Sequence, residues 1–135
     1  MTKQHLNPSD LLSFPPLSQV VVSTGNKLAF IAGQTACNAQ FEVLGGNDYR
    51  LQSIQALKNL QTAVEAAGAT VDDIVSSTVY LRDLTPTVAE QFIAAFSVAM
   101  DGEPFPAHAF TMVGVQALAS PDVLVEISAV VAFDD

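Results

Sequence analysis

The stretch VLVEISAVVAF, residues 123–133, decides the fold, because as a strand it is apolar on both faces. Side chains alternate across a strand, so one face carries Val123, Val125, Ile127, Ala129, Val131 and Phe133. That face is suited to packing against helices. The other face carries Leu124, Glu126, Ser128, Val130 and Ala132. It is too apolar for open water yet holds a carboxylate, so we expect a second subunit to cover it, with Glu126 at or near that interface.

Upstream of this strand, the first half of the chain predicts strands followed by a long loop. Residues 1–17 end in a Pro-Pro pair and are read as an irregular lead-in. LSQVVVS (17–23) and KLAFIAG (27–33) are predicted strands, and Thr24-Gly25-Asn26 between them is a hairpin signal. Residues 34–48 are predicted as a loop in which FEVL is a candidate short strand.

Two helices are predicted between the strands. From Tyr49 to Ala67, apolar residues recur every three or four positions, and Gly68 is a suitable stop. Thr85-Pro86 begins a second helix that extends to about Met100, with Thr85 as N-cap. IVSSTVYL and FTMVGV are further strands. The order β-β-α-β-α-β-β predicts one α+β domain over residues 1–135, with two helices on one face of the sheet.

Charge and composition exclude several classes of partner. The chain has 14 acidic and 5 basic residues, a net charge of −9, and no Lys or Arg after Arg82. Nucleic acid and anionic membranes are therefore poor partners, and no apolar run is long enough to span a membrane. The single cysteine, Cys37, excludes an internal disulfide and fits a reduced, cytoplasmic setting. No metal-ligand spacing is present, and the hydrophobic content of 50% favours an oligomer.

Four segments together resemble the RidA (YjgF) family over nearly the whole chain. They are LAFIAGQT (28–35), LKNLQTAVEAAGAT (57–70), VDDIVSSTVYLRDL (71–84) and VGVQALASPDVLVEISAVV (113–131). The resemblance implies a chorismate-mutase-like α+β subunit with a mixed sheet, assembled as a homotrimer with small-molecule sites between adjacent subunits. It also implies cofactor-independent hydrolysis of enamines and imines to keto acids and ammonia. Some relatives carry a ribonuclease label, which the acidity of this chain argues against.

Active members of the family are implied to use a Glu, an Arg that clamps the substrate carboxylate, a Tyr, and a Ser before Gly-Gln. Glu126 matches the Glu, which positions water or relays a proton, and Gly33-Gln34 match Gly-Gln. Ala32 replaces the Ser, and Leu17 stands where the Tyr is expected.

The clamp arginine itself is absent, and its position depends on the alignment. Anchoring on Pro106-Ala107 puts His108 there, whereas anchoring on residues 113–115 puts Phe110 there, and we favour the second. The neighbouring Thr111 is a further candidate ligand-binding residue, although threonine is also an ordinary strand former. His108 has an alternative interpretation as a histidine at the mouth of the strand.

Two functional hypotheses follow. In the first, the protein hydrolyses an imine, enamine or related small metabolite in an intersubunit cleft, with Glu126 as the catalytic group. In the second, it is a non-catalytic trimer that binds small molecules, or is chaperone-like, through a degenerate pocket. The missing clamp favours a neutral or apolar ligand in either case.

Overall fold

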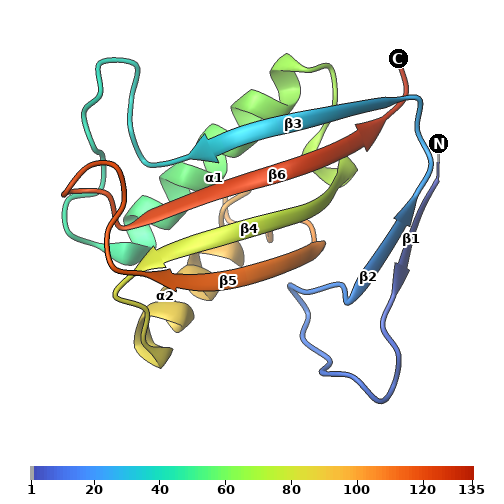
Figure 1. The fold of residues 1–135 in the computed structure, drawn as a ribbon, viewed down its shortest axis with the longest axis horizontal. Coiled ribbons are helices and arrows are strands. Elements are labelled where there is room, and N and C mark those ends of the chain that lie inside the picture. The colour runs from blue at the N-terminus through green and yellow to red at the C-terminus, as the bar shows by residue number, and fades with distance from the viewer. Residues whose placement is uncertain (1) are drawn as a thin grey trace.

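The computed structural model describes residues 2–135, which form a four-stranded sheet, a two-stranded sheet and two α-helices. In chain order the elements are β1 (Lys3–Leu6), β2 (Val20–Ser23), β3 (Lys27–Gln34), α1 (Tyr49–Ala66), the 3-10 turn η1 (Val71–Asp73), β4 (Ile74–Arg82), α2 (Pro86–Phe96), β5 (Ala109–Val115) and β6 (Val125–Phe133). The larger sheet has the order β3-β6-β4-β5, in which β4 and β5 are parallel and the other pairs antiparallel. Both helices lie behind this sheet in Figure 1, and its front face is open. The predicted α+β architecture is confirmed.

Local sequence accounts for where both helices begin. Asp48 caps α1 by accepting a hydrogen bond from the backbone N–H of Leu51 at 3.0 Å. Thr85 caps α2 in the same way and Pro86 occupies its first turn, because a proline there forfeits no helical hydrogen bond. After α1, Gly68 adopts a positive φ of 89°, the left-handed conformation that glycine adopts without strain. These ends agree with the predicted ones.

The core lies between the sheet and the helices. The predicted inner face of the last strand is buried throughout, and its central residue Ile127 is 1% exposed. α1 and α2 cover that face with apolar side chains at helical spacing, namely Leu57, Leu60, Val64, Phe92 and Phe96. The outer face of β6 is less covered, since Glu126, Ser128 and Val130 are half-buried. The sheet therefore has one face closed by helices and one available to solvent or to another molecule.

The N-terminal region differs from the prediction. Residues 3–6 form β1, and β2 pairs with β1 rather than with β3. The chain bends between β2 and β3 at Gly25, where an added Cβ would lie 2.9 Å from the backbone nitrogen of Phe133. Figure 1 shows the β1-β2 ribbon leaving the main sheet at this bend. Strand β1 is held by its backbone hydrogen bonds to β2 and by Lys3, whose Nζ donates to the carbonyl of Ala132 at 2.7 Å. These contacts produce no regular hydrophobic pattern in residues 1–17, which is why the sequence predicts an irregular segment there.

Two smaller predictions are also corrected. The second helix ends at Phe96 rather than near Met100, and Met100 instead bridges to Glu103 across a turn in which Asp101 and Gly102 both have positive φ. The candidate strand FEVL reduces to a single bridge between Cys37 and Val43. Neither change alters the order of the strands in the main sheet.

Candidate functional site

Glu126 lies on the open face of the sheet, in the middle of its ladder. It pairs with Tyr80 of β4 and is half-buried. Among residues 2–135, its carboxylate has no hydrogen-bond or ion-pair partner. A partly desolvated carboxylate is costly unless something pairs with it. This carboxylate is therefore placed to bind a group from outside the chain.

The backbone of β3 is shaped around this carboxylate. β3 carries a register shift between Ile31 and Gln34, so that two of its residues, Ala32 and Gly33, stand opposite a single position on β6. A Cβ at Gly33 would lie 2.0 Å from Glu126 Oε2, so any larger residue there would force the Glu126 side chain to move. A bulge of this kind commonly re-aims groups beside a functional site. Gly33 therefore lies against Glu126, and Ala32 lies next to Gly33 in the same bulge.

Gln34 follows these two residues but faces elsewhere. It pairs with Ile127, whose side chain is buried on the helix side. Its amide donates to the carbonyl of Ala32 at 3.1 Å, and it lines a cavity of about 360 Å³ beside α1 with Cys37 and Asn59. The structure does not bring the Gln34 side chain to Glu126.

Thr111 shares the open face with Glu126. It pairs with Thr78 of β4, which pairs in turn with Ser128 of β6, so three hydroxyl residues form a row across the sheet. The adjacent row is Val113, Tyr80 and Glu126. Thr111 is exposed, and this register places it on the same face as Glu126.

Phe110 lies on the opposite face of β5. It pairs with Ser77, whose side chain is buried on the helix side, and its ring centroid is 6.2 Å from that of Phe96 in α2. An aromatic side chain on an edge strand is most favourably placed where helix residues cover it. Under the favoured alignment, Phe110 is the residue at the arginine position, and the structure places it in the core layer, away from Glu126.

His108 is buried just before β5, on the same side as Phe110. It is 1% exposed and packs against the rings of Phe96 and Phe105. Its Nδ1 donates to the carbonyl of Pro106 at 2.9 Å, because a carbonyl can only accept. Nε2 of the neutral ring then accepts from the hydroxyl of Ser77 at 2.7 Å. Burial lowers the pKa of His108, although the bond to the Pro106 carbonyl partly opposes that shift.

These contacts leave His108 without a free donor for a ligand and favour the uncharged ring. The interpretation of His108 as a group at the mouth of the strand therefore agrees with the structure better than a carboxylate-binding role. Neither alignment of the missing arginine places a cation beside Glu126.

Leu17 lies at the far end of β5 from Glu126. Leu17 forms a β-bridge with His108. Val113, in the same row of the sheet as Glu126, comes five residues after His108. Five strand residues span about 16 Å. Leu17 also lines an apolar cavity of about 650 Å³ with Phe110 and Met112, next to α2. Within one chain, the predicted site residues are therefore divided into a group around Glu126 and a group around Leu17, and Gln34 lies apart from both.

A third cluster lies beside Leu17 and was not among the predicted site residues. His5 of β1 lies 2.7 Å, through Nδ1, from the hydroxyl of the buried Ser18. Both residues line a cavity of about 490 Å³, together with Asp72. This cluster is absent from the predicted site because residues 1–17 were read as irregular. Its one available signal was that His5 is one of only two histidines in the chain.

Metal and membrane features were sought across the described residues. Between residues 2 and 135, His, Cys, Asp and Glu side chains do not gather in groups of three or more that could hold a metal ion. None of the helices in that span is long and apolar enough to cross a membrane. Cys37 is a half-buried free thiol.

Comparison with known proteins places this arrangement in context. A family model described as Endoribonuclease L-PSP matches residues 9–133. A RutC family protein of Pyrococcus horikoshii is 34% identical over 116 residues, which cover 85% of each chain. A protein of Dermatophagoides farinae named 2-iminobutanoate/2-iminopropanoate deaminase is 28% identical over 96% of this chain and 100% of its own. The crystal structure of a protein of unknown function of the conserved Rid family from Yersinia pestis superimposes with a TM-score of 0.85, at 32% identity over 98% of this chain and 100% of that one.

Proposed function

The chain belongs to the Endoribonuclease L-PSP family, which includes the RidA and Rid proteins, and from this membership we propose that it is a cofactor-independent hydrolase of an uncharged imine or enamine. The observation that carries the proposal is the half-buried carboxylate of Glu126, which has no partner among residues 2–135 and lies against Gly33. Deaminase activity has a precedent in the name of the Dermatophagoides farinae relative.

The chemistry requires little more than a positioned water and a proton carrier. The imine carbon is already electrophilic, so the oxygen of a water held by Glu126 attacks it while the carboxylate accepts a proton from that water. The same proton then passes to the nitrogen. In the resulting amino alcohol, the hydroxyl proton passes to the nitrogen as the C=O bond forms and the C–N bond breaks, which releases ammonia and a carbonyl compound. One water is consumed for each imine.

The identity of the substrate follows from which charges lie near Glu126. On the open face of the described sheet, Glu126 shares its row with Tyr80 and Val113, and the row on one side of it holds Thr111, Thr78 and Ser128, all of them uncharged. The row on the other side holds Arg82, whose guanidinium is turned to the carbonyl of Pro121 and to Asp83. Charge-assisted binding of a substrate carboxylate would need a cation there. An uncharged imine avoids that requirement, which supports a neutral substrate over an anionic one.

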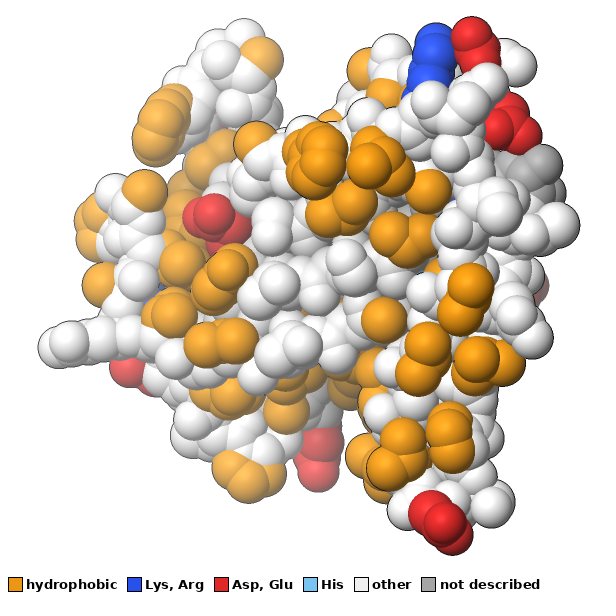
Figure 2. Space-filling model, turned by 45° about the vertical axis from the view of Figure 1, so that its right-hand side comes forward, with side chains coloured by type: hydrophobic (Ala, Val, Ile, Leu, Met, Phe, Trp, Pro, Cys, Tyr) orange, Lys and Arg blue, Asp and Glu red, His pale blue; other side chains and the backbone are white. Residues whose placement is uncertain are grey.

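The proposed site lies in a cleft of a homotrimer. The open face carries large exposed apolar side chains, including Leu28 at 62% and Phe30 at 75% exposure. Figure 2 shows hydrophobic side chains gathered on the visible side of the molecule. Covering each such residue contributes about 1.5–3 kcal/mol. Association through this face would place the half-buried carboxylate of Glu126 at the interface between copies.

A second candidate function is non-catalytic binding of small apolar molecules. The observation in its favour is the cavity of about 650 Å³ lined by Leu17, Phe110 and Met112. Its volume lies within the range of about 300–1,000 Å³ that is usual for ligand pockets. In this case the protein would bind its ligand on the helix side of β5 and Glu126 would not contribute.

A hydrolysis assay with two imines tests the proposal. An amine oxidase generates a neutral imine in the reaction mixture, and an amino-acid oxidase generates the anionic 2-iminobutanoate. We expect the protein to accelerate decay of the neutral imine more strongly. Glu126→Gln should abolish the acceleration, whereas the matched surface variant Glu65→Gln should retain it, because Glu65 is exposed on α1. Undiminished turnover by Glu126→Gln would remove the assigned role, and no acceleration of either imine would favour the binding function.

A further inference from the structure

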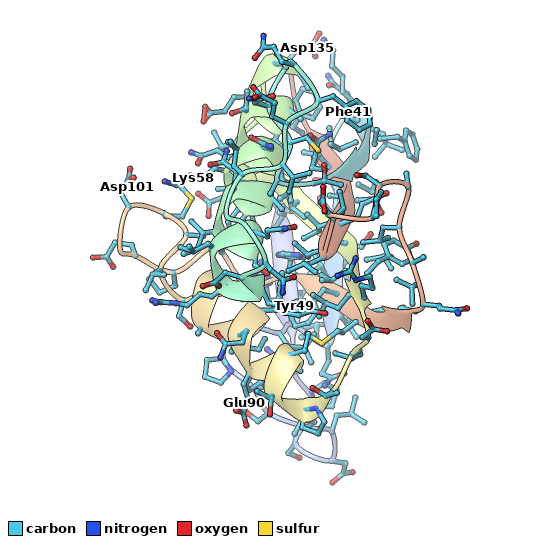
Figure 3. The ribbon with its side chains drawn as sticks, turned by 90° about the vertical axis from the view of Figure 1, so that its left-hand side faces the viewer. Phe41, Tyr49, Lys58, Glu90, Asp101 and Asp135 are labelled. Carbon is cyan, nitrogen blue, oxygen red and sulfur yellow. The ribbon has the colours of Figure 1, made fainter. Side chains whose placement is uncertain are left out.

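A separate polar cavity lies at the end of the molecule where β4 stops and α1 starts. Its volume is about 380 Å³, and its walls are Val43, Gly46, Asn47, Arg82, Pro121 and Asp122. Figure 3 looks at this end of the molecule, where Tyr49 marks the start of α1 among the connecting loops. None of these residues is among those predicted to bind a ligand, and Glu126 does not line the cavity.

The walls of this cavity are held by a buried glutamine. Gln52 is 0% exposed, and its Nε2 donates to the carbonyls of Gly46 at 2.7 Å and Asp122 at 2.8 Å. Its Oε1 accepts from the backbone N–H of Leu124 at 2.9 Å. One side chain thereby fixes the loop before α1 to the loop before β6. The two loops cannot separate without leaving buried polar groups unsatisfied, which keeps the cavity preformed.

Arg82 is fixed in the same region by its backbone and its guanidinium. Its carbonyl accepts from the Tyr49 hydroxyl at 2.5 Å, and its backbone N–H donates to Leu124 at 3.0 Å. Nη1 donates to the carbonyl of Pro121. Nε lies 3.8 Å from the carboxylate of Asp83, which is 72% exposed, so this ion pair is weak. The guanidinium therefore retains N–H donors that make no bond within residues 2–135.

Opposite charges face this cavity without neutralising one another. Arg82 and Asp122 both line it, yet over the described part of the chain their charged groups form no ion pair with each other. The side-chain amide of Asn47 is likewise without a hydrogen-bond partner among residues 2–135. A guanidinium and a carboxylate that share a cavity but do not pair leave room for a ligand that bridges them.

We propose that this cavity binds a small zwitterion of amino-acid type, with its carboxylate on Arg82 and its ammonium group on Asp122. A guanidinium matches the two oxygens of a carboxylate. The charges of Arg82 and Asp122 cancel, so the site favours a net-neutral dipolar molecule. A ligand with only a carboxylate leaves Asp122 unpaired, and a ligand with only an ammonium group leaves the free donors of Arg82 unpaired. The volume is at the lower end of the usual range for ligand sites, and Val43 offers an apolar contact for a short side chain.

Calorimetric titration with matched ligands tests the chemistry of the site. Glycine and L-valine carry both charges, L-valinamide lacks the carboxylate, and N-acetyl-L-valine lacks the ammonium group. We expect millimolar binding of one or both amino acids to the wild-type protein, and binding of the two derivatives weaker by at least about tenfold. Binding of neither amino acid, or equal binding of L-valine and its derivatives, would overturn the proposal.

Variants locate the binding and separate it from the proposed hydrolysis. Arg82→Gln and Asp122→Asn should each weaken amino-acid binding at least about tenfold. Arg50→Gln is the matched control, because Arg50 is an exposed arginine nearby that does not line the cavity. Glu126→Gln should leave binding unchanged, so failure of the hydrolase proposal does not affect this one. If Arg82→Gln fails to fold, Asp122→Asn decides the question alone, since the Asp122 side chain makes no bond within the described chain, and undiminished binding by that variant would contradict the proposal.

Discussion

Glu126 and His108 are both ionisable groups set among apolar residues, yet they lie on opposite faces of one sheet and differ in burial and in hydrogen bonding. His108 is 1% exposed, and both of its ring nitrogens are hydrogen-bonded, to Ser77 and Pro106. Glu126 is half-buried and has no partner among residues 2–135. A buried polar group whose bonds are complete stabilises the fold, whereas one whose bonds are incomplete is available to a ligand or a second chain. Mutation of His108 should therefore lower the free energy of unfolding, whereas mutation of Glu126 should abolish turnover and leave that free energy nearly unchanged.

The largest expected effect is on stability, from His108→Ala. The substitution leaves a cavity among Phe96, Phe105 and Phe110 and deprives the Ser77 hydroxyl of its partner. We expect a loss of about 2–5 kcal/mol in the free energy of unfolding, measured by urea denaturation. Thr111→Ala, on the exposed face of β5, the strand that follows His108, is the control and should cost less than about 1 kcal/mol. Equal losses in the two variants would mean that His108 is not a core residue.

The next effect concerns Gly33, which touches Glu126 rather than His108. In Gly33→Ala, the new Cβ would lie 2.0 Å from Glu126 Oε2, so the carboxylate must move. We expect a destabilisation of about 1–3 kcal/mol and loss of any turnover that depends on Glu126. The same substitution in a Glu126→Ala background should cost less, because the clash is gone, and a double-mutant cycle measures that difference. Full additivity would show that the two residues are not in contact.

A smaller effect should appear in the dependence of stability on pH. The pKa of His108 is lowered in the folded protein, chiefly by burial, from its ordinary value of 6.5. The contribution of the neutral His108 ring to the stability of the fold is therefore complete above the unfolded-state pKa. It is lost as the pH falls through 6.5 toward the folded-state pKa. Unfolding free energies between about pH 7.5 and 5.5 should fall more steeply for the wild type than for His108→Gln. Parallel slopes in the two proteins would contradict the lowered pKa of His108.

The sequence predicts the helices and the last strand well, but it does not predict the surroundings of Phe110 and His108. The helices and the inner face of the last strand follow from local patterns, such as the Thr85-Pro86 start of α2. Phe110 shows where patterns fail. FTMVGV is apolar at almost every position, so alternation gives no indication of which face of β5 meets α2. The state of His108 depends on Ser77, which is 31 positions earlier in the chain, and no local pattern encodes a partner at that separation.

The smallest stability effect is expected from Glu126→Gln, and it is the most direct test of the comparison. Within residues 2–135 the carboxylate makes no bond to lose, and the amide has nearly the same shape beside Gly33. The unfolding free energy should therefore stay within about 0.5 kcal/mol of the wild-type value, while imine turnover should disappear. A destabilisation comparable to that of His108→Ala would mean that Glu126 has a structural partner, which the described chain does not contain and a second copy would have to supply. In that case the carboxylate would serve assembly rather than catalysis, and the contrast between the two faces would no longer separate structural groups from functional ones.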